Sequence, residues 1–144
     1  MIAVDTNLLV YSHRSDSPFH QPAKDLIETL RNGRPFWAIP WPCLHEFLSI
    51  VTHPKIYKQP TPLTTAFEAI DAWRAANNLQ FLGESEGYLE KLGDLARSAK
   101  VRGPVIHDAR IAALCLHHGV RELWSADRDF SKFPTLAVRN PLPT

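Results

Sequence analysis

Short apolar runs recur along the chain, and each one ends in polar or turn-forming residues. They occupy residues 2–4, 36–39, 80–82, 122–125 and 137–138. Runs of this length are typical of buried strands, whereas helices need longer stretches with a wider period. The pattern therefore predicts five short strands spread over the whole chain.

Apolar residues at helical spacing fill most of the sequence between these runs. Residues 23–30 follow Pro22, which suits the first turn of a helix, and precede Gly33, which suits its end. A second helix should begin at Pro42 and end before His53-Pro54, because a residue that precedes proline avoids the helical conformation. Its apolar face is made of Leu44, Phe47, Leu48 and Val51.

Three further helices are predicted in the second half of the chain. Thr65 and Glu68 match a capping box at the start of a helix that continues to Trp73. Apolar residues at helical spacing then cover residues 88–96. A last helix covers residues 109–118 and is closed by Gly119, where a left-handed cap costs least.

The alternation of strands and helices predicts an α/β domain with a mainly parallel central sheet flanked by helices on both faces. A chain of 144 residues suits one such domain, so residues 1–144 are interpreted as a single unit. Hydrophobic residues make up 44% and charged residues 22%, as in ordinary globular proteins. No apolar run approaches the ~18 residues that span a bilayer, and the amino terminus lacks a basic region, so we expect a cytoplasmic protein with no membrane contact.

Four acidic residues stand where the predicted elements bring separate parts of the chain together. Asp5 and Asp127 follow predicted strands, Asp108 lies near the start of a helix, and Glu46 lies in the first two turns of another. Ligands of open α/β sheets collect beyond the carboxyl ends of the strands. Four converging carboxylates repel one another and call for a cation, and an all-oxygen set favours Mg²⁺ or Mn²⁺ over zinc.

Each acid taken alone is more typical of a solvated surface group, and Asp108 alone suits a helix cap. The formal net charge of +1 also argues against a nucleic-acid partner, because phosphate contacts need basic surface. Bound divalent ions would add positive charge and change that balance. Cys43 and Cys115 lack the spacing of a zinc site and are interpreted as buried thiols.

Several other side chains are candidates for contacts with a nucleic acid. Lys100 and Arg102, in a loop before Asp108, are the preferred pair for phosphate contacts, and Arg110 is a further candidate. Among the tryptophans, only Trp41 stands between prolines, where an exposed ring is expected.

The acidic residues lie in motifs that resemble those of PIN-domain nucleases, specifically the VapC-type toxins of type II toxin–antitoxin pairs. Residues 4–9 (VDTNLL), 44–47 (LHEF), 107–114 (HDARIAAL) and 123–130 (LWSADRDF) resemble the four family motifs in the correct order. The similarity spans nearly the whole chain. Ser125 stands where many relatives have threonine, which keeps the hydroxyl.

The resemblance implies an endoribonuclease that cleaves RNA with water activated by one or two Mg²⁺ or Mn²⁺ ions. The implied metal ligands and catalytic residues are Asp5, Glu46, Asp108 and Asp127, with Asn7, Ser125 and Asp129 supporting them. Either Asp127 or Asp129 suits the fourth ligand position, and Asp127 is preferred. The implied partners are a tRNA, rRNA or mRNA substrate, a small cognate antitoxin and a second copy of the chain, with contact surface from the apolar residues of 44–51 or 65–73.

Two other functions fit parts of the pattern. A catalytically silent PIN-like domain would bind RNA or protein without cleavage, but all four acids are present. A magnesium-dependent phosphohydrolase with an aspartyl nucleophile typically has a second acid two residues after the first, where this chain has Asn7.

Overall fold

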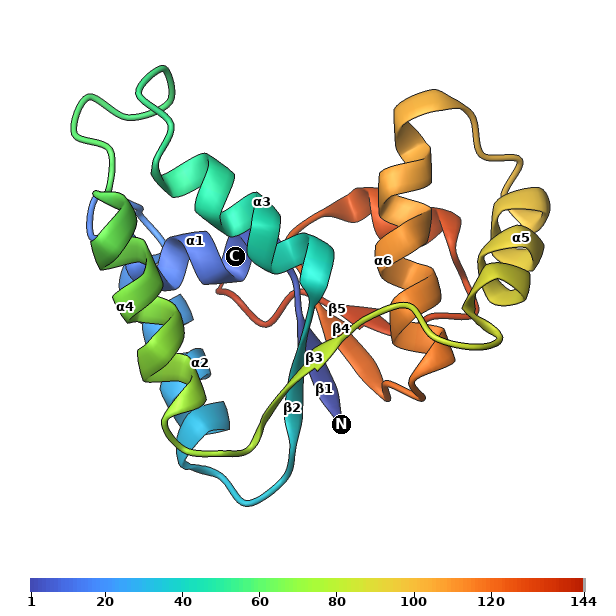
Figure 1. The fold of residues 1–144 in the computed structure, drawn as a ribbon, viewed down its shortest axis with the longest axis horizontal. Helices are drawn as coiled ribbons and strands as arrows, with labels where there is room; N and C mark the ends of the chain where they lie inside the picture. Colours follow the sequence, from blue (N-terminus) through green and yellow to red (C-terminus); the bar gives the residue numbers. More distant parts are fainter. Residues whose placement is uncertain (144) are drawn as a thin grey trace.

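The computed structural model describes residues 1–143, and its centre is one sheet of five parallel strands (Figure 1). The strand order is β3-β2-β1-β4-β5. The chain therefore runs outward from β1 to β3, then crosses to the other side of β1 to add β4 and β5. The strands are β1 (Ile2–Val4), β2 (Trp37–Pro40), β3 (Leu79–Leu82), β4 (Glu122–Trp124) and β5 (Val138–Arg139).

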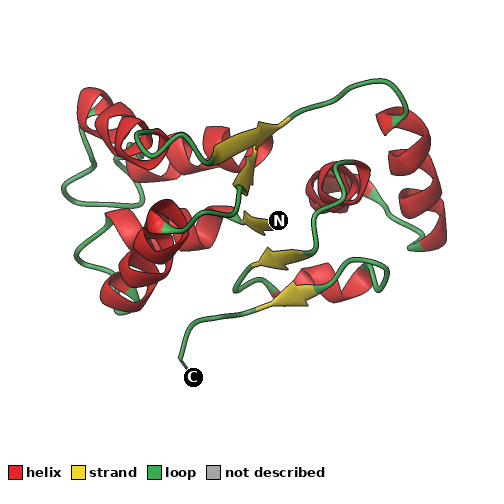
Figure 2. Cartoon of the chain, turned by 90° about the horizontal axis from the view of Figure 1, so that it is seen from below, coloured by secondary structure: helices red, strands yellow, loops and turns green. Residues whose placement is uncertain are grey.

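Helices cover both faces of the sheet, as the alternating pattern predicts (Figure 2). One layer holds α1 (Thr6–His13), α2 (His20–Asn32), α3 (Trp41–Val51) and α4 (Leu63–Arg74). The other holds α5 (Tyr88–Ser98) and α6 (Ile106–His117). Two 3₁₀ turns, η1 (Gly103–Val105) and η2 (Arg128–Lys132), precede α6 and follow β4. The predicted fold class is thus confirmed. No helix in the described part of the chain is long and apolar enough to cross a membrane.

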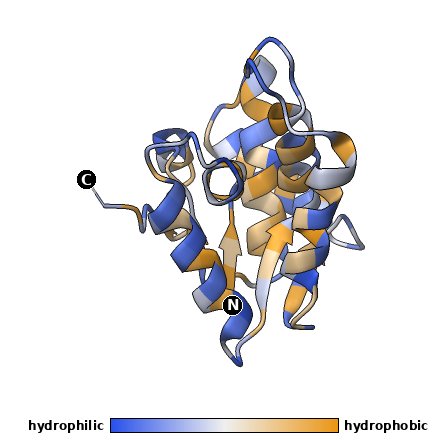
Figure 3. Cartoon of the chain, turned by 90° about the vertical axis from the view of Figure 1, so that its left-hand side faces the viewer, coloured by the Kyte–Doolittle hydropathy of each residue, from blue (hydrophilic) through white to orange (hydrophobic). Residues whose placement is uncertain are grey.

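The hydrophobic core lies between the sheet and the two helix layers. All four residues of β2 are buried, which explains why its sequence is continuously apolar rather than alternating. Figure 3 shows apolar strands beside helices that mix hydrophobic and hydrophilic positions. Cys43 and Cys115 are both buried and free, as predicted. Gly119 closes α6 with a φ of +68°, a left-handed conformation that favours glycine.

Several predicted boundaries differ from the structure. The capping-box prediction was wrong, because α4 begins at Leu63 with Pro62 at its N-cap, and Thr65 lies inside the helix. The helix predicted to follow Pro22 begins two residues before it, at His20. The 3₁₀ turn η2 was not predicted. Local sequence patterns do not predict how far tertiary packing extends a helix at its ends.

The apolar face predicted for an interface on residues 44–51 is mostly in the core. Leu44, Phe47 and Val51 are buried against the rest of the protein, so they offer no surface to a partner. The alternative segment, residues 65–73, carries one large exposed apolar side chain, Phe67, which is 49% exposed.

Candidate active site

The site lies at the carboxyl ends of β1 and β4, where the strand order of the sheet reverses direction. Crevices at such switch points are where open parallel sheets bind ligands. Asp5 directly follows β1, and its backbone N–H donates to the carbonyl oxygen of Trp124 at 2.9 Å. Ser125 and Asp127 follow β4. The pairing of β1 with β4 therefore fixes these three residues close together at the carboxyl ends of the two strands.

Asp5 is held in a buried polar environment and is only 4% exposed. Ser125 Oγ donates to its Oδ2 at 2.6 Å, and Cys43 Sγ donates to its Oδ1 at 3.4 Å. Burial raises the pKa of Asp5, and the carboxylate of Glu46 adds to the rise, while the two hydrogen bonds oppose it. Both oxygens are thus oriented by neighbours, and a nearby positive charge would favour the ionised form.

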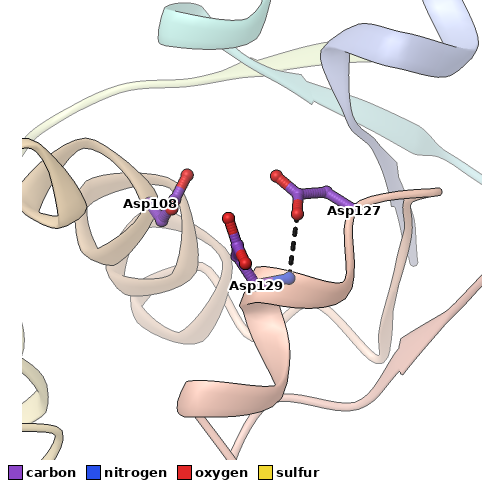
Figure 4. Close-up of side chains that lie close together, drawn as sticks. All are labelled: Asp108, Asp127 and Asp129. Atoms are coloured by element: carbon purple, nitrogen blue, oxygen red, sulfur yellow. Dashed lines mark hydrogen bonds between the residues drawn. The ribbon is translucent and has the colours of Figure 1, made fainter.

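Asp108, Asp127 and Asp129 form an acidic cluster (Figure 4). One carboxylate oxygen from each lies within 4.8 Å of those of the other two. Asp108 comes from the first turn of α6, while Asp127 and Asp129 come from the start of η2. Burial and the charges of Asp127, Asp129 and Asp5 raise the pKa of Asp108. The cluster is therefore electrostatically unfavourable without a cation.

Asp127 also accepts a hydrogen bond from the backbone N–H of Asp129, at 2.8 Å, and so caps η2. Its own N–H donates to Ser125 Oγ at 3.0 Å. Asp127 borders the cavity described below, whereas Asp129 is not among the residues that line it.

Glu46 reaches the site from the second turn of α3. Thr6 Oγ1 donates to its Oε2 at 3.0 Å, which links Glu46 to the residue after Asp5. A cavity of about 290 Å³ is bordered by all four predicted acids, Asp5, Glu46, Asp108 and Asp127. The structure thus brings together side chains from four separate segments of the chain.

Asn7 and Ser125 connect the two strand ends. Asn7 Oδ1 accepts from the backbone N–H of Ala126 at 3.3 Å, so the start of α1 is tied to the segment after β4. Ser125 bonds both Asp5 and Asp127. These contacts are of the kind that orients ligands around a metal ion.

The donor set fits a hard divalent cation. All the acidic side chains at the site offer oxygen atoms, the ligands that Mg²⁺ and Mn²⁺ prefer. Within residues 1–143, none of the ion pairs involves Asp5, Glu46, Asp108, Asp127 or Asp129. Their charge is therefore not compensated by a paired Lys or Arg.

The three basic residues predicted to contact phosphate do not line the cavity. Lys100 and Arg102 are exposed in the loop before η1. Arg110 lies on α6 and pairs with Glu84, with Nη2 2.9 Å from Oε1. Their contact with RNA stays a prediction.

Trp41 is the exposed tryptophan, as predicted, at 39%, while the other three are buried. Its ring stacks on Phe81, with centroids 4.4 Å apart.

The sequence interpretation missed several residues of the site, among them Thr6, Tyr11, Cys43 and Tyr57. Thr6 lies inside the opening motif, so its place near the site could be predicted from the sequence. Its hydrogen bond to Glu46 could not. Cys43 was interpreted only as a buried thiol, since nothing in the sequence places it against Asp5. Tyr11 and Tyr57 also line the cavity. Tyr57 lies in a loop. The spacing of apolar residues predicts where side chains point only in helices and strands, so it could not place the Tyr57 ring.

Comparisons with known proteins assign the chain to one family. The PIN domain family matches residues 2–136. Ribonuclease VapC48 of Mycobacterium tuberculosis is 34% identical over 95% of this chain and 94% of its own length. Ribonuclease VapC43 of the same organism is 35% identical over 99% of this chain and 96% of its own. A toxin–antitoxin complex from Klebsiella pneumoniae contains a chain with the same fold, with a TM-score of 0.62 at 21% identity and coverage of 98% of both chains.

The chain therefore belongs to the PIN domain family. Within that family it belongs with the VapC ribonucleases, which it matches over almost its full length.

Proposed function

We propose that this PIN-domain ribonuclease is an endonuclease that depends on a divalent cation and acts as the toxin of a toxin–antitoxin pair. The observation that carries the proposal is the convergence of Asp5, Glu46, Asp108 and Asp127 on one cavity from four separate segments. Single acids are common on protein surfaces, but four that border one space without an ion-pair partner are not.

Asp5, Asp108 and Asp127 would hold one or two Mg²⁺ or Mn²⁺ ions, and Glu46 would complete the set or orient water. When bound, such an ion would lower the pKa of a coordinated water molecule, and its positive charge would stabilise the phosphate oxygens. The chain itself fixes the acids. Ser125 and Cys43 orient Asp5, and Thr6 orients Glu46. No histidine lines the cavity among the described residues, so we assign no general base to one.

Asp127 is the preferred fourth ligand, because it borders the cavity that Asp5 and Asp108 line. Asp129 is a supporting residue, whose N–H holds the Asp127 carboxylate. Lys100, Arg102 and Arg110 are proposed to contact the RNA backbone outside the cavity.

The relatives' names support the proposed partners. VapC48 and VapC43 are named ribonucleases, and the similar Klebsiella chain comes from a toxin–antitoxin complex. We therefore propose RNA as substrate, a small antitoxin as partner and the cytoplasm as the place of action. We also propose a homodimer, for which Phe67 on α4 offers exposed apolar surface.

The test is cleavage of single-stranded RNA by the purified chain with Mg²⁺, Mn²⁺ or excess EDTA. We expect cleavage with either ion, none with EDTA, and none for Asp5→Asn or Asp108→Asn. Asp94→Asn is the matched control, since that aspartate is exposed on α5 and pairs only with Arg97. Full activity in EDTA contradicts the proposal. Binding of RNA with no cleavage under any condition favours a catalytically silent domain instead.

A further inference from the structure

The cavity that the acids border has a second wall, which is apolar and partly aromatic. Beside the carboxylates it is lined by Val10, Tyr11, Ile50, Tyr57, Ile111 and Phe130. The carboxylates fit the binding of a cation, through which a phosphate could be held, but they do not account for this wall. A space lined by both carboxylate oxygens and aromatic rings can take both parts of a nucleotide, the phosphate through a bound cation and the base on a ring.

Tyr57 is fixed in place although it lies in the loop between α3 and α4. The Arg14 guanidinium covers its ring, with Cζ 3.8 Å from the ring centroid. Arg14 is itself held by Asp16, with Nη2 2.6 Å from Oδ2, and donates to the carbonyl oxygen of Gln59 at 2.9 Å. Its side chain is only 12% exposed. Arg14 therefore joins this loop to the end of α1 and positions the Tyr57 ring at the cavity.

Tyr11 contributes the second ring from α1. Its ring centroid lies 5.4 Å from that of Phe19, so this ring packs against another aromatic side chain. Two aromatic side chains from different elements therefore border the same space before any ligand is present. Preformed aromatic surfaces reduce the entropic cost of binding a flat ligand.

We propose that this wall is a nucleobase subsite, in which one base next to the scissile phosphate stacks on Tyr57. The inference rests on the ribonuclease function proposed above. Its occupant follows from the continuity of the cavity, because a phosphate bound through a cation at the carboxylates would keep its own nucleotide within the same space. Aromatic side chains stack on unpaired bases of RNA, and a base in this cavity has left any duplex. The wall therefore selects single-stranded RNA and sets a base preference at one position beside the cut.

The substrate for the test is found with a random-sequence pool of single-stranded RNA, cleaved by the wild-type protein with Mn²⁺ and sequenced at the new ends. One cleaved sequence is then made with an abasic ribose on either side of the cut. The variants are Tyr57→Leu, which removes the ring, and Tyr57→Phe, which keeps it. Phe36→Ala is the control, because that exposed aromatic side chain directly precedes β2. It therefore lies at the amino ends of the strands, whereas the site lies at their carboxyl ends.

For the wild type, one of the two abasic positions should raise KM about tenfold or more, the range of base–aromatic stacking. Tyr57→Leu should raise KM for the intact RNA by a similar factor, show no further rise with the abasic RNA, and lose the base preference in the pool. Its kcat should stay close to that of the wild type. Tyr57→Phe and Phe36→Ala should behave like the wild type. Arg14→Lys loses the planar guanidinium and should also raise KM with little change in kcat, which identifies a positioning residue.

The proposal is overturned if Tyr57→Leu keeps the wild-type KM and base preference, or if the abasic RNA is penalised equally in both proteins. It is also overturned if Tyr57→Leu leaves RNA kinetics unchanged and weakens only the complex with the cognate antitoxin, because the wall would then be a protein-docking surface. Melting temperatures of the variants show whether a loss of activity is a loss of fold. No cleavage by the wild type of any RNA in the pool contradicts the proposed function itself, which separates the two failures.

Discussion

Ser125 and Asp5 are joined by a hydrogen bond of 2.6 Å, although they stand 120 positions apart in the sequence. The same Ser125 hydroxyl accepts the N–H of Asp127 at 3.0 Å. One small side chain therefore sets the distance between two of the proposed metal ligands. Buried hydroxyls in such positions orient a carboxylate without adding charge.

The first prediction concerns Ser125. Ser125→Ala removes a donor to a buried carboxylate and an acceptor for the Asp127 N–H, so it should reduce cleavage about 10- to 100-fold, as other losses of metal-site support do. The melting temperature should fall by the equivalent of about 2 kcal/mol, because hydrogen bonds to charged groups contribute that much. Activity assays and thermal unfolding check both. Ser125→Thr, which keeps the hydroxyl, should recover most of the activity, and an alanine variant with full activity would show that the bond has no role.

The second prediction concerns the stability of the metal-free protein. Asp108→Asn keeps the size of the side chain and removes a charge that lies close to Asp127 and Asp129. It should abolish cleavage and raise the melting temperature at pH 7, by about 2–4 °C for each kcal/mol of repulsion that is relieved. A helix cap would behave in the opposite way, with a loss of about 1 kcal/mol. Asp94→Asn should change the melting temperature by the equivalent of less than about 0.5 kcal/mol.

This difference between the wild type and Asp108→Asn should depend on pH. The pKa of Asp108 lies above its ordinary value of 3.8, so the folded protein binds the carboxyl proton of Asp108 more tightly than the unfolded protein does. Its ionisation therefore destabilises the folded protein as pH rises through the raised pKa. The stability gap between variant and wild type should be largest at neutral pH and should narrow as pH falls toward 4. A gap that stays constant over this range would contradict a charge origin.

The third prediction separates Asp127 from Asp129. For the true ligand, replacement by asparagine should reduce the rise in melting temperature that added Mg²⁺ produces, since that rise comes from binding to the folded state. We expect this of Asp127→Asn and a nearly normal rise for Asp129→Asn. The reverse result would assign the fourth ligand position to Asp129 and leave Asp127 as the cap of η2.

The fourth prediction is that cation binding releases protons. Asp5 and Asp108 have raised pKa values, and a bound divalent ion requires them ionised. Mg²⁺ or Mn²⁺ affinity should therefore weaken as pH falls from 7 to 5. Titration calorimetry in two buffers of different ionisation enthalpy measures the released protons directly. An affinity that does not change over this range would show that the carboxylates are already ionised in the free protein.

Much of the fold could be predicted from the sequence because the central strands β1, β2 and β4 are mostly buried and form separate apolar runs in the sequence. The strand at residues 2–4 was located to the residue, and the helix of Asp108 was recognised from its composition and from Gly119. The start of α4 was missed because Thr65 and Glu68 match a capping box that the helix does not use. The helix begins earlier, where Pro62 and Leu63 follow the buried Thr61.

The site was predictable to a smaller extent. The acids were recognisable because they follow strands or lie in the first turns of helices. The topology brings these positions together at the carboxyl ends of the strands. The partners of these acids were not, since the contacts of Thr6 with Glu46 and of Cys43 with Asp5 cross between elements. The 3₁₀ turn that places Asp127 beside Asp129 spans only five residues and leaves no periodic signal.

The position of β4 between β1 and β5 has a consequence during synthesis of the chain. Asp5, Glu46 and the Tyr57 loop are all made early, but β1 lacks its second neighbour until residues 122–124 have left the ribosome. A nascent chain that ends before this point already contains Asp5, Glu46 and Asp108, but it lacks the strand β4 that brings Ser125 and Asp127 to them. The site is therefore assembled only after β4 and Asp127 have been made and β4 has paired with β1.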